Sequence, residues 1–417
     1  MKPLELAIRN NKPNQFRLLL DLGHDVNQVA EDGNSLLFLA VWNHVDLDLF
    51  QPLFEKRAQV NARDYNERTP LFLSAWLNSK DASRILINNG AKVNAKDCRG
   101  QTPLFFAVRK NAVDTAGLLI ESGAKVNVKD KSGSTPLSVS AEYNRITIAE
   151  LLIKKDAMVN AKNDLGQTPL FMAAKKNAVA VAKLLIKNGA VVNTKEYFDQ
   201  TPLFWAASEN SKAVAELLID NGANIHTHCK LGRTPLFEAA KTNSQEIVKL
   251  LIENGADIDI KDNGGKTPLF EAVKNNSYNV VKLLIESGAD VNTTDEWGNT
   301  LLQALSMMNH FKEIAPLLIE QGADPNVTNC VDETPAERAL NSNYELLLDA
   351  IMDKNTEKVR EALKTRIDIN ESGSMFLQLA VERYYKPQIL ELLLKHGADP
   401  SLLSKPLQRK FEKRFST

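Results

Sequence analysis

The sequence predicts an all-α protein built as a solenoid of stacked helix pairs. A Thr-Pro dipeptide recurs every 33 residues, at Thr69, Thr102, Thr135, Thr168, Thr201, Thr234 and Thr267. Two further series keep the same period, Gly-Ala pairs between Gly90 and Gly288 and Val-Asn pairs between Val93 and Val291. A fixed period of this length indicates a repeat architecture, and we expect about twelve repeats in an elongated, curved stack.

Residues 234–266 show how the helices of one repeat are expected to form. Thr234 is a helix N-cap residue, and Pro235 occupies the first helical position, where its missing N–H costs nothing. The second helix is predicted from Gln245 to Glu253, with apolar residues on one face. Gly255 then ends it in the left-handed conformation, and residues 262–265 form a turn. One such pair cannot bury its apolar face alone, so neighbours must stack.

The ends of the chain are expected to act as caps. Residues 1–32 form an N-terminal capping repeat, and residues 33–330 form the regular repeats. Residues 331–403 are predicted to be divergent repeats, in the first of which the second helix extends through residues 346–351. Residues 404–417 form a basic C-terminal capping helix that carries Lys405, Arg409, Lys410, Lys413 and Arg414.

The repeat resembles that of the ankyrin-repeat family, whose pattern is a β-turn and two helices around T-P-L-H-x-A. The histidine of that pattern is replaced by phenylalanine at Phe38, Phe72, Phe105, Phe171, Phe204, Phe237 and Phe270, and by Ser138 in one copy. The resemblance implies that the first helices line a concave face and that turn tips project beside it. It also implies that apolar packing replaces the polar network of the family histidine.

Composition limits the possible partners and compartments. The 417 residues carry 51 Lys and Arg against 52 Asp and Glu, a net charge of −1, which argues against nucleic acid as the main partner. Three widely spaced cysteines make a disulfide framework or a cysteine-rich zinc module unexpected. We expect no signal peptide and no membrane insertion, because no apolar run approaches about 18 residues. The expected location is the cytoplasm.

Motifs for catalysis are missing from the sequence, so we expect a protein that is not an enzyme and has no cofactor. The Gly-Lys-Thr at residues 265–267 lacks the first glycine of a phosphate-binding loop, since Ile260 stands in that position. His226, His228 and Cys229 are potential soft-metal ligands, but a fourth ligand is not evident. Metal binding and simple sequence drift both remain open there, and no metal site is predicted.

The positions that the repeat leaves variable indicate a binding face. Residues seven and eight after the repeat threonine end the first helix, and many are basic or aromatic. Such side chains on a scaffold are typical of interface hot spots. The candidate partner-binding residues are Trp42, Trp76, Arg109, Lys110, Tyr143, Lys175, Lys176, Trp205, Lys241 and Lys274. The alternative is a solvated, lysine-rich surface in which Trp205 packs against a neighbouring helix.

These observations favour a non-enzymatic scaffold, a monomer that binds a protein partner with an acidic segment on the concave face and turn tips. Repeats rich in Asn and Lys are typical of AT-rich genomes, which favours an effector of an intracellular bacterium or parasite that acts on host proteins in the host cytoplasm. The alternative hypothesis is an adaptor in which residues 331–417 form a separate docking or enzymatic domain.

Overall fold

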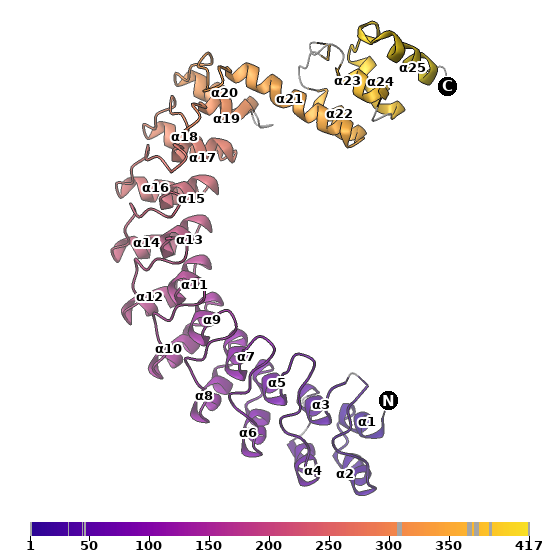
Figure 1. The fold of residues 1–417 in the computed structure, drawn as a ribbon. Coiled ribbons are helices and arrows are strands. Elements are labelled where there is room, and N and C mark those ends of the chain that lie inside the picture. Colours follow the sequence, from indigo (N-terminus) through magenta and orange to yellow (C-terminus); the bar gives the residue numbers. More distant parts are fainter. Residues whose placement is uncertain are drawn as a thin grey trace. The chain divides into compact units, whose positions relative to one another are not determined.

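The computed structural model describes residues 2–31, 33–43, 45, 47–306, 311–364, 369–370, 375–382 and 386–415. Within these residues the chain forms 25 α-helices and two 3₁₀-helices (Figure 1). No strand is formed in the described part, where extended pairing is limited to two isolated bridges, Val29 with Ser35 and Thr294 with Thr300. The predicted all-α repeat fold is confirmed.

Twenty of the helices form ten successive pairs. The first helices of the pairs are α1 (Pro3–Arg9), α3 (Leu36–Trp42), α5 (Pro70–Trp76), α7 (Pro103–Lys110), α9 (Pro136–Glu142), α11 (Pro169–Lys175), α13 (Pro202–Ser208), α15 (Pro235–Lys241), α17 (Pro268–Lys274) and α19 (Leu301–Ser306). The second helices are α2 (Pro13–Asp21), α4 (Phe50–Glu55, preceded by the 3₁₀-helix Leu47–Leu49), α6 (Lys80–Asn88), α8 (Val113–Glu121), α10 (Ile146–Lys154), α12 (Val179–Lys187), α14 (Lys212–Asp220), α16 (Gln245–Glu253), α18 (Tyr278–Glu286) and α20 (Phe311–Glu320).

The C-terminal region contains α21 (Pro335–Met352), α22 (Thr356–Ala362), α23 (Met375–Glu382), α24 (Pro387–Lys395), the 3₁₀-helix Pro400–Leu402 and α25 (Lys405–Phe415). In the first divergent repeat, the expected second helix is not separate: α21 runs unbroken from Pro335 through residues 346–351. The predicted basic terminal helix is present as α25, although the side chains of Lys410, Lys413 and Arg414 lie outside the described residues.

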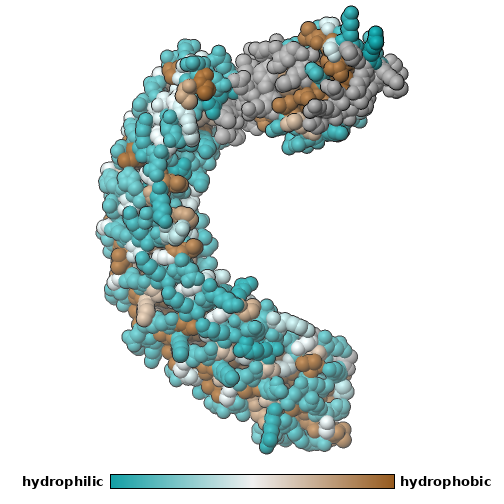
Figure 2. All heavy atoms as spheres, in the orientation of Figure 1, coloured by the Kyte–Doolittle hydropathy of each residue, from teal (hydrophilic) through white to brown (hydrophobic). Residues whose placement is uncertain are grey.

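The chain divides into two compact units. The first unit contains residues 1–239 and 246–256, and the second contains residues 240–245 and 257–417. Most of the surface of the first unit that is visible in Figure 2 is hydrophilic. The domain limits expected at residues 32, 330 and 403 stay predictions.

A ladder of asparagine side chains explains the periodic Val-Asn pairs. Asn94 Nδ2 donates to Gly123 O at 2.9 Å, and Asn94 Oδ1 accepts from Lys125 N at 2.9 Å. Each asparagine of the series in the first unit therefore ties its turn to the helix end of the next repeat. Asn370 makes the same two bonds in the second unit, to Gly397 O at 2.8 Å and from Asp399 N at 3.0 Å. The C-terminal region thus keeps the inter-repeat bonding of the regular repeats.

The repeat threonines stand at N-cap positions as predicted, but most do not form the capping hydrogen bond. The hydroxyls of Thr69, Thr102, Thr168 and Thr201 are buried without a hydrogen-bond partner. The hydroxyls of Thr135 and Thr267 do accept the capping bond, from Ser138 N and Phe270 N, both at 3.3 Å. Because Ser138 replaces the usual phenylalanine, Thr135 N also donates to Ser138 Oγ at 2.9 Å, which makes the pair reciprocal.

This difference predicts opposite effects for the same substitution in neighbouring repeats. Thr168→Val removes a buried hydroxyl that has no partner, so we expect it to leave stability unchanged or to raise it by about 1 kcal/mol. Thr135→Val breaks a reciprocal capping pair and should cost about 1 kcal/mol. Urea denaturation of the two variants measures both values. A destabilised Thr168→Val would show that its hydroxyl is hydrogen-bonded in solution.

Two helix ends lack the usual glycine, and both adopt the left-handed conformation predicted for them. Arg57 has a φ of 61° and Asp156 a φ of 60°, whereas Gly189, one repeat after Asp156, has a φ of 83°. Left-handed backbone costs a residue with a Cβ atom about 1 kcal/mol or more.

Asp156→Gly should therefore raise stability by about 0.5–1 kcal/mol, after allowance for the greater freedom of glycine in the unfolded chain. Gly189→Asp is the matched reverse change, since a Cβ atom at Gly189 would meet nothing within 4 Å and only backbone strain would be added. The midpoint of thermal unfolding should rise for the first variant and fall for the second. A lower midpoint for Asp156→Gly would contradict the strain argument.

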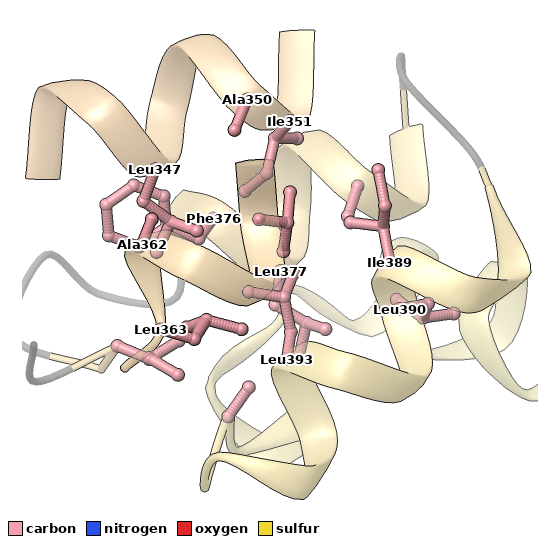
Figure 3. Close-up of a cluster of buried hydrophobic side chains, with 14 of the residues drawn as sticks. Leu347, Ala350, Ile351, Ala362, Leu363, Phe376, Leu377, Ile389, Leu390 and Leu393 are labelled. Carbon is pink, nitrogen blue, oxygen red and sulfur yellow. The ribbon is translucent and has the colours of Figure 1, made fainter. Parts of the chain in front are cut away.

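The C-terminal helices share one apolar core (Figure 3). Leu347 and Ile351 of α21 and Val359 of α22 are fully buried, as are Phe376 of α23 and Leu393 of α24. Leu407 and Phe411 of α25 pack against the same cluster. The last five α-helices are therefore held together by a common core.

Candidate functional site

The first unit arranges its helices in two layers (Figure 1). From α1 to α13, each first helix packs against the next first helix, and from α6 to α14 each second helix packs against the next second helix. In the regular repeats the fourth residue after the repeat threonine lies in the middle of the first helix, and the seventh and eighth lie at or just beyond its C-terminal end. We call the surface that these positions form in the first unit the first-helix face.

Most of the sequence-predicted residues lie on this face with at least part of the side chain accessible. Trp42 is 58% exposed and Tyr143 is 39% exposed. Trp76, Arg109, Lys175 and Trp205 are half-buried, and Lys110 and Lys176 are exposed. Lys241 and Lys274 are also exposed at the ends of their helices, but they belong to the second unit. The structure therefore does not place these two lysines in one site with the others.

The structure brings the predicted basic and aromatic residues of the first unit together in pairs. Lys110 Nζ lies 3.8 Å from the ring centroid of Trp76, and Lys175 Nζ lies 4.8 Å from that of Trp205. The guanidinium carbon of Arg109 lies 5.8 Å from the ring centroid of Tyr143. Each pair joins one repeat to its neighbour, and each is within the range of a cation–π interaction.

Trp205 has a structural contact as well. Its ring meets that of Phe171 edge to face, with the centroids 6.4 Å apart. The packing alternative for Trp205 is therefore partly correct, because one side of the indole supports the neighbouring first helix while Lys175 lies over the ring.

A groove of about 690 Å³ opens on the N-terminal part of the first-helix face. We call it the N-terminal groove. Its lining residues come from α1, α3, α5, α7 and the turns between them: Arg9, Asn34, Phe38, Leu39, Trp42, Asp64, Arg68, Phe72, Leu73, Trp76, Arg99, Phe106 and Arg109. The groove contains three of the predicted residues, Trp42, Trp76 and Arg109, and adds an apolar and basic lining that the sequence interpretation missed.

Phe106 connects the apolar and basic parts of the groove. Its ring meets Phe72 edge to face at 5.2 Å and Trp76 at 5.9 Å. The guanidinium carbons of Arg68 and Arg109 lie 5.1 and 5.6 Å from the centroid of the same ring. Phe106 is the fourth residue after its threonine and Arg68 directly precedes Thr69, so scanning those two repeat positions would have found them.

The two histidines and the cysteine that are potential metal ligands lie on opposite sides of their loop. His226 and His228 are exposed, and Cys229 is buried. The His228 ring Nδ1 lies 3.0 Å from Gly232 O, which occupies one ring nitrogen. Across the residues that the structure describes, no group of three or more His, Cys, Asp or Glu side chains is arranged to hold a metal ion.

No helix in the described part of the chain has the length and apolar character needed to cross a membrane.

Comparison with known proteins identifies the family. The chain matches ankyrin repeats in seven overlapping segments, at residues 4–97, 37–130, 86–163, 123–196, 157–229, 203–295 and 254–329. The matches cover more than half of the chain, so it belongs to the ankyrin-repeat family. Proteins of this family generally mediate protein–protein interactions and are typically non-enzymatic scaffolds, and no catalytic family is indicated for this chain.

One curated relative is an ankyrin repeat protein of Rickettsia bellii (strain RML369-C). It is 34% identical over 62 residues, which make up 15% of this chain and 9% of the relative. The chain therefore spans a small part of the length of the relative that it matches.

Proposed function

We propose that this protein is a non-enzymatic scaffold that binds an acidic segment of a protein partner on the first-helix face. The observation that carries the proposal is the interleaving of cations and aromatic rings, as in Lys110 over Trp76 and Lys175 over Trp205. Aromatic rings supply large contact areas that lose water on binding, and the cations beside them favour carboxylates.

We further propose that the protein acts in the cytoplasm, and in the host cytoplasm as a delivered effector of an intracellular bacterium or parasite. The Asn- and Lys-rich repeats and the match to a Rickettsia ankyrin repeat protein support this. Fractionation of infected cells, with antibody detection of the protein, tests it. Detection only in the microbial fraction would contradict delivery.

Affinity capture followed by binding kinetics tests the proposed face. The full-length protein and a chain that ends at Cys330 should capture the same partner. The double variant Lys175→Glu, Lys176→Glu should slow association several-fold and reduce its dependence on salt, since exposed charges mainly affect encounter. The matched control is Lys183→Glu, Lys187→Glu, which makes the same change of charge on the exposed side of α12.

A tryptophan substitution tests the aromatic part of the face. Trp76→Ala should raise the dissociation rate, with an affinity loss of about 2 kcal/mol if this residue is a hot spot. Trp297→Ala is the control, because Trp297 is 52% exposed at a turn tip in the second unit. If Trp297→Ala weakens binding and neither first-helix variant does, the turn tips are the interface and the proposed face is wrong.

A further inference from the structure

The N-terminal groove has an apolar surface that is open to a partner. The indole of Trp42, which lines the groove, is 58% exposed, while Phe72 and Phe106, which also line it, are almost fully buried. The ring contacts of Phe106 with Phe72 and Trp76 fix the position of this apolar surface. An exposed indole beside ordered rings can contact a large apolar side chain at little cost in conformational entropy.

The charges around this apolar surface are mostly positive. Arg9, Arg68, Arg99 and Arg109 line the groove, against the single carboxylate of Asp64. Asp64 Oδ1 already accepts backbone N–H groups of Asn66 and Arg68, both at 2.8 Å. The Asp64 carboxylate therefore stabilises the turn in which it lies.

Two of the four arginines have no anionic neighbour in the described structure. Arg9 pairs with Glu5 at 3.0 Å, and Arg68 Nε lies 4.0 Å from Asp97. For Arg99 and Arg109, by contrast, no carboxylate of the described residues lies within 4.0 Å. The contacts of the Arg109 guanidinium are neutral: it donates to Gln101 Oε1 at 3.2 Å and lies over Phe106 and Tyr143.

We propose that the N-terminal groove binds an acidic peptide segment that carries an aromatic or large aliphatic anchor residue next to its carboxylates. The anchor lies against Trp42 and Trp76, and the carboxylates pair with Arg99 and Arg109, whose planar guanidinium groups suit carboxylates. This inference rests on the proposed function and names the chemistry of the partner. A peptide is favoured over nucleic acid because the cations are few and local in a chain with a net charge of −1.

Selection from a phage-displayed library of random dodecapeptides on the immobilised full-length protein tests the motif. Selected sequences should place Asp or Glu within three residues of Trp, Phe or Leu. One selected peptide, labelled with a fluorescent dye, is then titrated against purified variants by fluorescence anisotropy. Trp42→Ala and Arg99→Gln should each weaken its binding about tenfold, as expected for hot-spot residues.

Both variants alter exposed side chains, so they should fold, and thermal melting checks this. The matched controls are Trp297→Ala, at a tryptophan of similar exposure in the second unit, and Arg84→Gln, at an exposed arginine on α6. Both controls should bind the peptide like the wild type.

The other outcomes separate this inference from the proposed function. Some selected peptides could lose binding to the double variant Lys175→Glu, Lys176→Glu but not to Trp42→Ala or Arg99→Gln. This result would overturn the inference that the peptide binds in the N-terminal groove, and it would agree with binding elsewhere on the first-helix face. Selected peptides that lack Asp and Glu, and that bind the lysine double variant, Trp42→Ala and Arg99→Gln like the wild type, would overturn both the groove inference and the proposed function. Failure to select any peptide counts against the groove, because an open site of this size should accept a linear segment. Displacement of the peptide by an equal concentration of a U12 RNA would make nucleic acid the ligand and overturn the inference.

Discussion

Removal of residues 370–417 is expected to leave a chain that aggregates or frays from its C-terminal end. The deletion takes away α23, α24 and α25, which pack on the buried side chains of Leu347 and Ile351 (Figure 3). Val359 belongs to the same cluster. Each of these side chains is 0% exposed in the full chain. Exposing a large aliphatic side chain costs about 1.5–3 kcal/mol, and terminal repeats normally provide the polar cap of such a stack.

Light scattering coupled to size exclusion, together with thermal melting, measures the effect of this truncation. The control is a chain that ends at Ser404 and lacks only α25, from which Leu407 and Phe411 pack on the edge of the cluster. That shorter deletion should lower the melting temperature less and leave most of the protein monomeric. If the chain ending at Ile369 stays monomeric and melts like the full chain, the C-terminal region is an independent domain.

The sequence was sufficient to predict the regular repeats because one period carries several independent local signals. The helix from Gln245 to Glu253 is found at the predicted residues, and Gly255 has the predicted positive φ, at 87°. Each signal acts within a few residues: proline at a helix start, glycine or asparagine in a left-handed end, and an apolar stripe between them. Such local rules do not depend on knowing the neighbouring repeats.

The divergent repeats were harder to predict because the asparagine that ends the first helix is kept there, as Asn343, but does not end the helix. In the regular repeats an asparagine such as Asn144, with a φ of 52°, ends the first helix and reverses the chain. At the corresponding place after Thr334 the chain stays helical, and α21 extends over 18 residues. Helix propensity and packing in the core of the C-terminal helices therefore determine where the helices of this region begin and end. Neither can be evaluated from the 33-residue repeat period.

The binding face was predictable residue by residue but not as a surface. The sequence pointed to Trp76 and Lys110 separately, and only the stacking of repeats places them 3.8 Å apart. The N-terminal groove was missed because its lining combines helix and turn positions from four repeats, such as Arg68 and Phe106. The fourth position after the threonine was considered for binding only at Trp205, although it is polar or apolar in different repeats and is therefore free to vary.

Phe171→Ala is expected to cost about 3–5 kcal/mol of stability in the repeats around it. Phe171 replaces the family histidine and is 0% exposed, so its truncation leaves a cavity between first helices. It also removes the edge-to-face contact with Trp205, which is worth about 0.5–1.5 kcal/mol beyond the buried area. Trp205 would then lose a support on the side opposite to solvent, so the pair that it forms with Lys175 should loosen.

Urea denaturation and amide hydrogen exchange measure this effect at the level of the whole chain and of single repeats. Exchange is needed because a repeat array can unfold in parts, in which case one global free energy is not defined. Phe198→Ala is the control: it deletes the same ring at a turn tip where the side chain is 55% exposed, and it should change stability by about 0.5 kcal/mol or less. Equal effects of the two substitutions would show that the phenylalanine series is not the apolar core that replaces the histidine network. A large loss confined to α9, α11 and α13 would instead show that this core also holds the aromatic residues of the first-helix face in position.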